Sequence, residues 1–328
     1  MPRNISIVAR RLSRALFVAS AVMASRARAQ TNSVPESAVP APAKPKPPPY
    51  SLPWQLRGVA PANVIRSDTS FGFYKVNGQS GSTIASMLLG SYKVIPELAV
   101  IGRIGAVSNA PPKPTHHAQV FVNPVLGALY GIKLDPSLKL GLFLGFTLPI
   151  GKGGDPKTEP GMAAAESPYG ANARSALDNA MFAVDYFTII PGVDLAYISG
   201  GFTAQVEATL FSLQKARGPD TIDRDNTNFT AGLHLGYFLI PELSIGAELR
   251  HRRWLSTPAA VSKDTTHTLR DDSSVAIGPR LHVKLSDSIW FRPGIAVALP
   301  LDSPLASSSN AKTPTDYKIV QLDLPLVF

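Results

Sequence analysis

The sequence predicts an all-β fold, a transmembrane antiparallel β-barrel of about 12 strands with one helical extracellular loop. Three observations support this prediction. Large apolar residues stand at every second position through most of residues 67–328. The residues between them are small, polar or charged. Short turns and long polar connections alternate along the chain, as they do in a barrel whose two ends differ.

The alternation is clearest in residues 138–150, where large apolar residues flank Lys139, Gly141, Gly145 and Thr147. Successive side chains of a strand point to opposite faces of a sheet, so one face is apolar and the other is small or polar. Each such segment can supply the roughly 9–11 tilted residues that cross a bilayer. The pattern predicts strands at residues 67–76, 83–95, 98–108, 118–134, 138–150, 185–198, 201–213, 228–240, 243–255, 273–285, 289–300 and 317–328.

Composition excludes several classes of protein. The chain has no Cys, which excludes a disulfide scaffold, a thiolate metal site and a Cys nucleophile. No apolar run reaches the roughly 18 residues of a transmembrane helix. The formal net charge is +9, but six of the 32 basic residues lie in residues 1–29, which contain no acidic residue. The remainder carries only a small positive charge, so nucleic acid is not an expected partner.

The N-terminal residues predict an exported protein. Residues 1–29 contain a basic region, a short apolar stretch and a small-x-small cleavage site, as in a signal peptide. Residues 30–60 are expected to form a Pro-rich periplasmic linker, because Pro-rich chain adopts extended polyproline II structure. Two alternatives stay open for this linker, a docking segment for a partner and a piece of chain that threads the lumen. The barrel is expected over residues 61–328.

The last strand carries a resemblance to bacterial outer-membrane β-barrel proteins of the porin-like kind. A terminal aromatic residue follows apolar residues at every second position, namely Val320, Leu322, Leu324, Leu326 and Phe328. The resemblance implies a closed antiparallel barrel in the outer membrane of a Gram-negative bacterium, in contact with its lipid and recognised through this strand by the barrel assembly machinery. Pro325 departs from the pattern because it cannot donate a ladder hydrogen bond.

If the apolar set faces lipid, the other set faces the lumen. The residues expected there are Arg103, Lys139, Asp194, Glu207, His234, Glu248, Arg250, Arg280, His282, Lys284, Arg292 and Asp323. Charge inside a barrel is consistent with either a salt-bridged, occluded interior or a pore lining. The excess of basic residues would favour anionic solutes if a path exists.

The longest connection, residues 151–184, bears on the same question. Ala173, Leu177, Ala180 and Met181 stand at helical spacing, so the loop can carry a helix. Such a helix can fold into the mouth and constrict it, or it can cap the rim.

Three functions follow from these features. The preferred one is a pore or passive transporter for small polar or anionic solutes, either alone or as a homo-oligomer. The alternative is a structural or surface-interaction barrel with an occluded lumen. The third is an outer-membrane hydrolase that uses His251 and Ser256, but the His-x-Ser-Asn-Gly motif of outer-membrane phospholipases is absent. The preferred interpretation is not an enzyme and assigns no catalytic, cofactor-binding or metal-binding residue.

Overall fold

The computed structural model describes residues 50–328 except 77, 111–116, 154–168, 176, 219, 221, 264–268 and 303–316. The predicted signal peptide and residues 30–49 of the predicted linker lie outside the described residues. Everything discussed below belongs to one compact unit that begins at Pro47.

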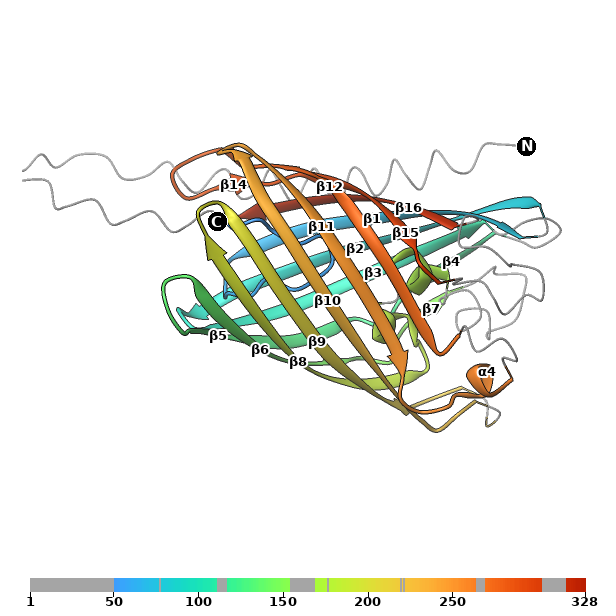
Figure 1. Ribbon diagram of the computed structural model, residues 1–328. Coiled ribbons are helices and arrows are strands. Elements are labelled where there is room, and N and C mark those ends of the chain that lie inside the picture. Colours follow the sequence, from blue (N-terminus) through green and yellow to red (C-terminus); the bar gives the residue numbers. More distant parts are fainter. Residues whose placement is uncertain are drawn as a thin grey trace, which may run out of the picture. The chain divides into compact units, whose positions relative to one another are not determined.

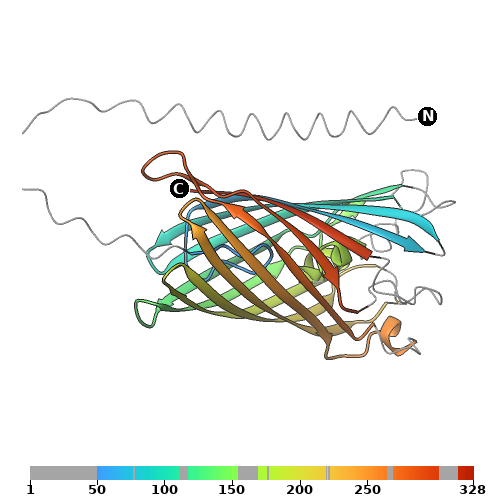
Figure 2. The same cartoon turned by 45° about the horizontal axis from the view of Figure 1, so that its top comes forward.

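The described chain forms a closed antiparallel barrel of 12 strands (Figures 1 and 2). Each strand pairs with its neighbours in sequence, and β1 pairs with β16 from Val64↔Val327 to Tyr74↔Tyr317, which closes the sheet. The prediction of an all-β barrel is therefore confirmed. The barrel strands are β1 (Val64–Val76), β2 (Gln79–Ile95), β3 (Leu98–Ala110), β5 (Val125–Lys133), β6 (Leu138–Thr147), β8 (Tyr186–Ser199), β9 (Phe202–Lys215), β10 (Asp225–Ile240), β11 (Leu243–Trp254), β12 (Asp271–Leu281), β15 (Gly294–Pro300) and β16 (Tyr317–Val327).

Some predicted strands are interrupted. The predicted strand 118–134 divides into β4 (Ala118–Phe121) and β5, with Pro124 between them. The predicted strand 289–300 divides into β14 (Trp290–Phe291) and β15, with Pro293 between them. Proline has no N–H for the ladder, so strands break or bulge at these positions. The remaining short elements are β7 (Lys152–Gly153), β13 (Val283–Lys284), α3 (Asn179–Phe182) and α4 (Ala259–Ser262).

The two ends of the barrel differ, as the sequence predicts. At one end, here called the short-turn end, only a few residues join β2 to β3, β5 to β6, β8 to β9 and β10 to β11. At the other end, the long-loop end, lie the ends of the strands that longer stretches of sequence connect, β6 to β8, β11 to β12 and β15 to β16. The β1–β2 connection at the long-loop end is an exception. It is a tight turn at Gly78, whose φ of +76° suits glycine.

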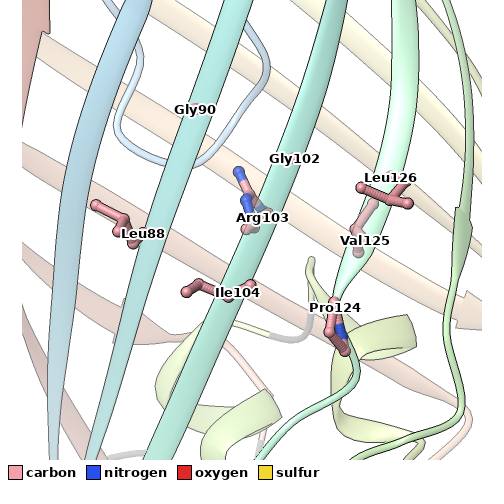
Figure 3. A pocket seen from close by; sticks show the side chains of 8 residues that line it. All are labelled: Leu88, Gly90, Gly102, Arg103, Ile104, Pro124, Val125 and Leu126. Carbon is pink, nitrogen blue, oxygen red and sulfur yellow. The ribbon is translucent and has the colours of Figure 1, made fainter.

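The two faces of the barrel wall have opposite character. Leu144 and Ile277 point outward and are 60% and 56% exposed, whereas Asp194 and Glu248 point inward and are fully buried. Figure 3 shows part of the outer face, where Leu88, Ile104 and Leu126 border a depression over two glycines of β2 and β3. An apolar exterior around a charged interior is the inverse of a water-soluble barrel and is the arrangement that a lipid environment requires.

Tyrosines mark one border of this apolar face. Tyr92, Tyr197 and Tyr237 are exposed near the short-turn end. Tyrosine is enriched at the level of lipid headgroups. No helix in the described part of the chain is long and apolar enough to cross a bilayer.

A depth-dependent substitution tests the lipid-facing assignment. Ile277 lies midway along β12 opposite Ala247 and Val297, whereas Leu281 ends the strand. We expect Ile277→Arg to lower the free energy of unfolding by about 2–4 kcal/mol, and Leu281→Arg by at most about 1 kcal/mol, because charge costs most at the bilayer centre. Urea titration of the barrel in phospholipid vesicles measures both. Equal losses at the two positions would contradict the assignment.

Candidate functional site in the barrel lumen

Two segments of the chain fill the lumen in this structure. Residues 50–60, here called the N-terminal plug, lie inside the wall before β1 begins, and Trp54, Leu56 and Val59 are buried. Residues 169–184, here called the loop plug, fold inward from the long-loop end, and Ala173 and Met181 are buried (Figure 2). Side chains alone fill a barrel of about eight strands, so a barrel of 12 has room for additional chain.

Arginines of the barrel bind the carbonyl groups of the N-terminal plug. Arg280 donates from Nε to the carbonyl of Leu52 at 3.1 Å, and it donates to that of Pro53 at 3.4 Å. Arg66 donates to the carbonyl of Trp54. Arg292 donates to the carbonyl of Tyr50 at 3.4 Å. These contacts satisfy plug carbonyls that are cut off from water, and they give the buried guanidinium groups partners.

Carboxylates bind the N–H groups of the same plug. The backbone N–H groups of Trp54 and Gln55 donate to Glu248. The N–H of Arg57 donates to Glu207 at 2.6 Å. Hydrogen bonds from N–H groups to an ionised acceptor are stronger than neutral ones. The plug is thus held along its backbone by charged side chains.

Arg57 is the charged side chain of the N-terminal plug. Its guanidinium lies 3.3 Å from Asp194 and 3.2 Å from Glu207, and it donates to Thr209 at 2.8 Å. It also lies over the ring of Phe143. β8 and β9 present this acidic pair side by side, because Asp194 and Glu207 are cross-strand partners. Two adjacent carboxylates repel each other, so a cation between them stabilises both.

The loop plug is held by a mixture of ionic and apolar contacts. Arg174 pairs with Asp68 of β1 and with Asp178 one turn later in the loop, and Asp178 also pairs with Arg103 of β3. Asn179 and Asn228 exchange side-chain hydrogen bonds at 2.9 Å. An apolar cluster joins the plug to the inner wall and includes Ala171, Ala173, Ala180, Met181, Phe182, Val184, Val107, Val120, Leu129, Phe143, Ile190, Phe211 and Leu213. The loop therefore folds into the lumen, which is one of the two predicted alternatives.

Ion pairs connect the two plugs through the wall. Asp323 of β16 lies 2.5 Å from Arg280 and 2.7 Å from Arg66, and Arg66 lies 3.7 Å from Asp68, the partner of Arg174. A second route runs from Glu248 to Arg250, whose guanidinium reaches Gln321 at 2.7 Å and Ser175 at 3.2 Å. Each plug thus contacts the same barrel network.

The charge state of the loop plug follows from this network. Burial alone would raise the pKa of the Asp178 carboxyl, but the guanidinium groups of Arg103 and Arg174 outweigh burial and lower that pKa to about 2. Asp178 is therefore ionised throughout the neutral and mildly acidic range, and its ion pairs persist there.

The structure places the predicted lumen residues on the inner face, with one exception. Lys284 belongs to β13, in a short hairpin at the short-turn end, where it is half exposed and pairs with Asp287 of the following turn at 2.6 Å. The period-two pattern does not continue into the barrel there because β12 ends at Leu281. The residues on the inner face are Arg103, Lys139, Asp194, Glu207, His234, Glu248, Arg250, Arg280, His282, Arg292 and Asp323.

Several site residues were missed in the sequence. The described end of the predicted linker, residues 50–60, lies in the lumen, which matches the alternative in which this chain threads the barrel. Arg66 and Asp68 were also missed because the first predicted strand began at residue 67, although their alternation with Ile65 was a visible signal. A further visible signal was the four-residue spacing of Arg174 and Asp178 in a loop with helical periodicity.

The hydrolase interpretation requires His251 to contact Ser256, but the two side chains have different hydrogen-bond partners. The Nδ1 atom of His251 lies 3.0 Å from the hydroxyl of Ser273. The hydroxyl of Ser256 instead donates to Asn226 and to the carbonyl of Thr227.

The fold, the apolar outer face and the filled, charged interior define a transmembrane β-barrel with an internal plug. No family model matches the sequence, and no curated protein matches it. Among solved structures, the chain is similar to an outer-membrane channel from Pseudomonas putida F1, with 11% identity, 84% of this chain and 98% of that chain covered, and a TM-score of 0.48. It is also similar to the KdgM porin in complex with disordered oligogalacturonate, with 9% identity, coverage of 81% and 99%, and a TM-score of 0.43. A third similarity, to the transport unit of the autotransporter AIDA-I from Escherichia coli, has 10% identity, coverage of 81% and 90%, and a TM-score of 0.46.

Removal of Arg174 tests the ionic anchoring of the loop plug. We expect Arg174→Met to lower the free energy of unfolding by about 3–5 kcal/mol, because two buried carboxylates lose a shared partner. Lys284→Met is the matched control. It breaks a solvent-exposed pair, and we expect no measurable change. Urea titration in phospholipid vesicles compares the two, and a stable Arg174→Met barrel would show that the pairs do not anchor the plug.

Proposed function

We propose that this protein is an outer-membrane channel for small polar solutes, and that its N-terminal plug is the gate that closes it. The observation that carries the proposal is what fills the lumen. Barrel side chains do not fill it by themselves, because two inserted chain segments take up the interior. Withdrawal of a segment would leave a passage lined by charged and polar side chains, which water can enter.

The N-terminal plug is better suited to move than the loop plug. Within the described residues it continues into the barrel at one end, through residues 61–63 and β1, and it belongs to no strand, so it can leave without breaking a ladder hydrogen bond. Its backbone is held by polar contacts, which water can replace, and its apolar cluster with β8 is small, consisting of Tyr50, Val59 and Ala60 with Ala196 and Ile198. The loop plug is tied at both ends and packs in an apolar cluster, which resists exposure to water.

The ion pairs of the lumen affect which solutes the channel would favour. Six arginines of the described interior, Arg57, Arg66, Arg103, Arg174, Arg250 and Arg280, pair with the six carboxylates of Asp68, Asp178, Asp194, Glu207, Glu248 and Asp323, whereas Arg292 binds a plug carbonyl. The interior therefore has little net positive charge. This pairing argues for small polar solutes in general over a strong preference for anions. On opening, Arg280, Arg292 and Arg66 would lose their plug carbonyls, and Arg292, which has no carboxylate partner among the described residues, would then attract anionic groups.

A second candidate function is the structural barrel with an occluded lumen. The apolar packing of the loop plug favours it, since that packing closes the long-loop side of the lumen independently of the N-terminal plug. In this case the loops at the long-loop end would contact partners, and neither plug would move.

The apolar outer face and the terminal strand support the proposed location in an outer membrane. Leu322 and Phe328 are exposed on the outer face of β16 or at its end, and Val320, Leu324 and Leu326 occupy the other positions of the same alternation. These residues are therefore placed where an assembly machinery acting from the membrane could bind them. The short-turn end would face the periplasm, as in other outer-membrane barrels.

Weakening the N-terminal plug tests the gate. Leu56 is buried beside Gly232, and we expect Leu56→Ala to cost the closed state about 2–5 kcal/mol. The ratio of open to closed time should rise by at least about 30-fold. Single-channel conductance in planar bilayers measures it, with ion selectivity taken from the reversal potential. Leu249→Ala on the outer face of β11 is the control, which we expect to gate like the parent protein.

Tethering the plug gives the complementary test. A Cβ atom built on Gly236 lies 2.5 Å from the Cβ of Ser51, so a small outward shift brings the pair to the roughly 3.8 Å of a disulfide. The chain contains no other Cys that could interfere. We expect the Ser51→Cys/Gly236→Cys variant to be silent when oxidised and to open when reduced, with each single variant unaffected by redox state. Equal silence of every variant, including Leu56→Ala, would support the occluded barrel instead.

A further inference from the structure

We propose that the lumen around the N-terminal plug is a binding site for extended peptides, and that residues 50–57 occupy it as an internal ligand. This inference rests on the proposed function and names the solute class of the channel as short oligopeptides. The inference rests on the hydrogen bonds between the wall and the individual backbone groups of the plug.

Two chemically distinct sets of wall side chains bind the backbone of the plug. Guanidinium and amide donors bind its carbonyl groups, since Gln205 donates to the carbonyl of Arg57 at 2.7 Å in addition to the arginine contacts described above. Acceptors bind its N–H groups, since Thr203 accepts from Ser51 at 3.1 Å in addition to the carboxylate contacts. The donors are Arg66, Gln205, Arg280 and Arg292, and the acceptors are Thr203, Glu207 and Glu248.

Two large side chains of the plug lack, among the described residues, the hydrogen-bond partners that its backbone has. The indole N–H of Trp54 and both amide atoms of Gln55 are buried, and none of them has a hydrogen-bond partner among the described residues. The N–H groups of these same two residues both bind Glu248. At these two positions the described wall recognises the main chain and provides no polar partner for the side chain.

Three other side chains of the plug do have polar partners in the wall. The hydroxyl of Tyr50 donates to Gln205 at 2.5 Å, and the hydroxyl of Ser51 lies 3.2 Å from Nε2 of His234. The third, Arg57, defines a charged subsite. Arg57 places its guanidinium between Asp194 and Glu207, so a peptide bound in the direction of the plug would place a cationic side chain there. The preferred ligand is therefore a peptide with at least one positive charge.

The experiment uses three synthetic peptides and the full chain with the Leu56→Ala substitution, which loosens the internal ligand. The first peptide has the sequence of residues 50–57. The second has residues 50–55 scrambled, with Leu and Arg kept in the last two positions. The third is the first peptide with N-methyl groups at the positions of Trp54, Gln55 and Arg57, which removes the N–H groups that the carboxylates bind. Binding is measured by isothermal titration calorimetry in detergent, and block of the single-channel current is measured in parallel.

We expect the first two peptides to bind with similar Kd values and the N-methylated peptide to bind at least about tenfold more weakly, because hydrogen bonds to charged groups are lost. Glu207→Gln should weaken binding of the first peptide, and Asp287→Asn in an exposed turn should leave it unchanged. If Leu56→Ala does not fold, the Ser51→Cys/Gly236→Cys variant replaces it, and peptide should bind only after reduction.

The outcomes separate this inference from the proposed function. Current without peptide binding, or equal binding of the N-methylated peptide, overturns the peptide site and leaves the channel standing. Peptide binding without current supports the site and overturns the channel. Binding of the first peptide but not of the scrambled one also overturns the inference, because recognition would then depend on side chains.

Discussion

The width of a 12-stranded barrel is the constraint on which the rest of the structure depends. A lipid-facing wall forces apolar residues outward, so polar and charged residues accumulate inside. The side chains of 12 strands do not meet at the axis, and an interior of this kind is either filled with water or filled with more chain. In this protein more chain fills the interior, and the two plugs enter it from opposite ends of the barrel.

Filling a charged interior requires that every charge find a partner, because an unpaired buried charge is strongly destabilising. In this protein the charges share partners. Asp323 pairs with both Arg66 and Arg280, and Asp68 pairs with both Arg66 and Arg174. The N-terminal plug contributes only one charge, that of Arg57. Its backbone completes the network by supplying carbonyls to arginines and N–H groups to carboxylates.

The wall of the barrel could be predicted from the sequence, and its contents could not. Lipid imposes a period-two pattern on every strand, so residues such as Leu144 and Ile277 reveal the outer face one strand at a time. The N-terminal plug has no such pattern. Its burial depends on Glu248, Arg280 and Glu207, which come together only when the barrel closes. The prediction that Lys284 lies in the lumen is wrong because the alternation of apolar residues continues in the sequence past Leu281, where β12 ends.

The same interactions explain why opening would depend on what enters. A plug that leaves into water exposes Asp194, Glu207, Glu248 and Arg280 to a narrow space where solvent screens them incompletely. A solute that offers carbonyl and N–H groups in sequence would replace the plug contact by contact, so the network would stay satisfied during the exchange. On the proposed function, the closed state would therefore be least stable in the presence of the solutes that most resemble the plug. Gating and selectivity would then be two aspects of one set of hydrogen bonds.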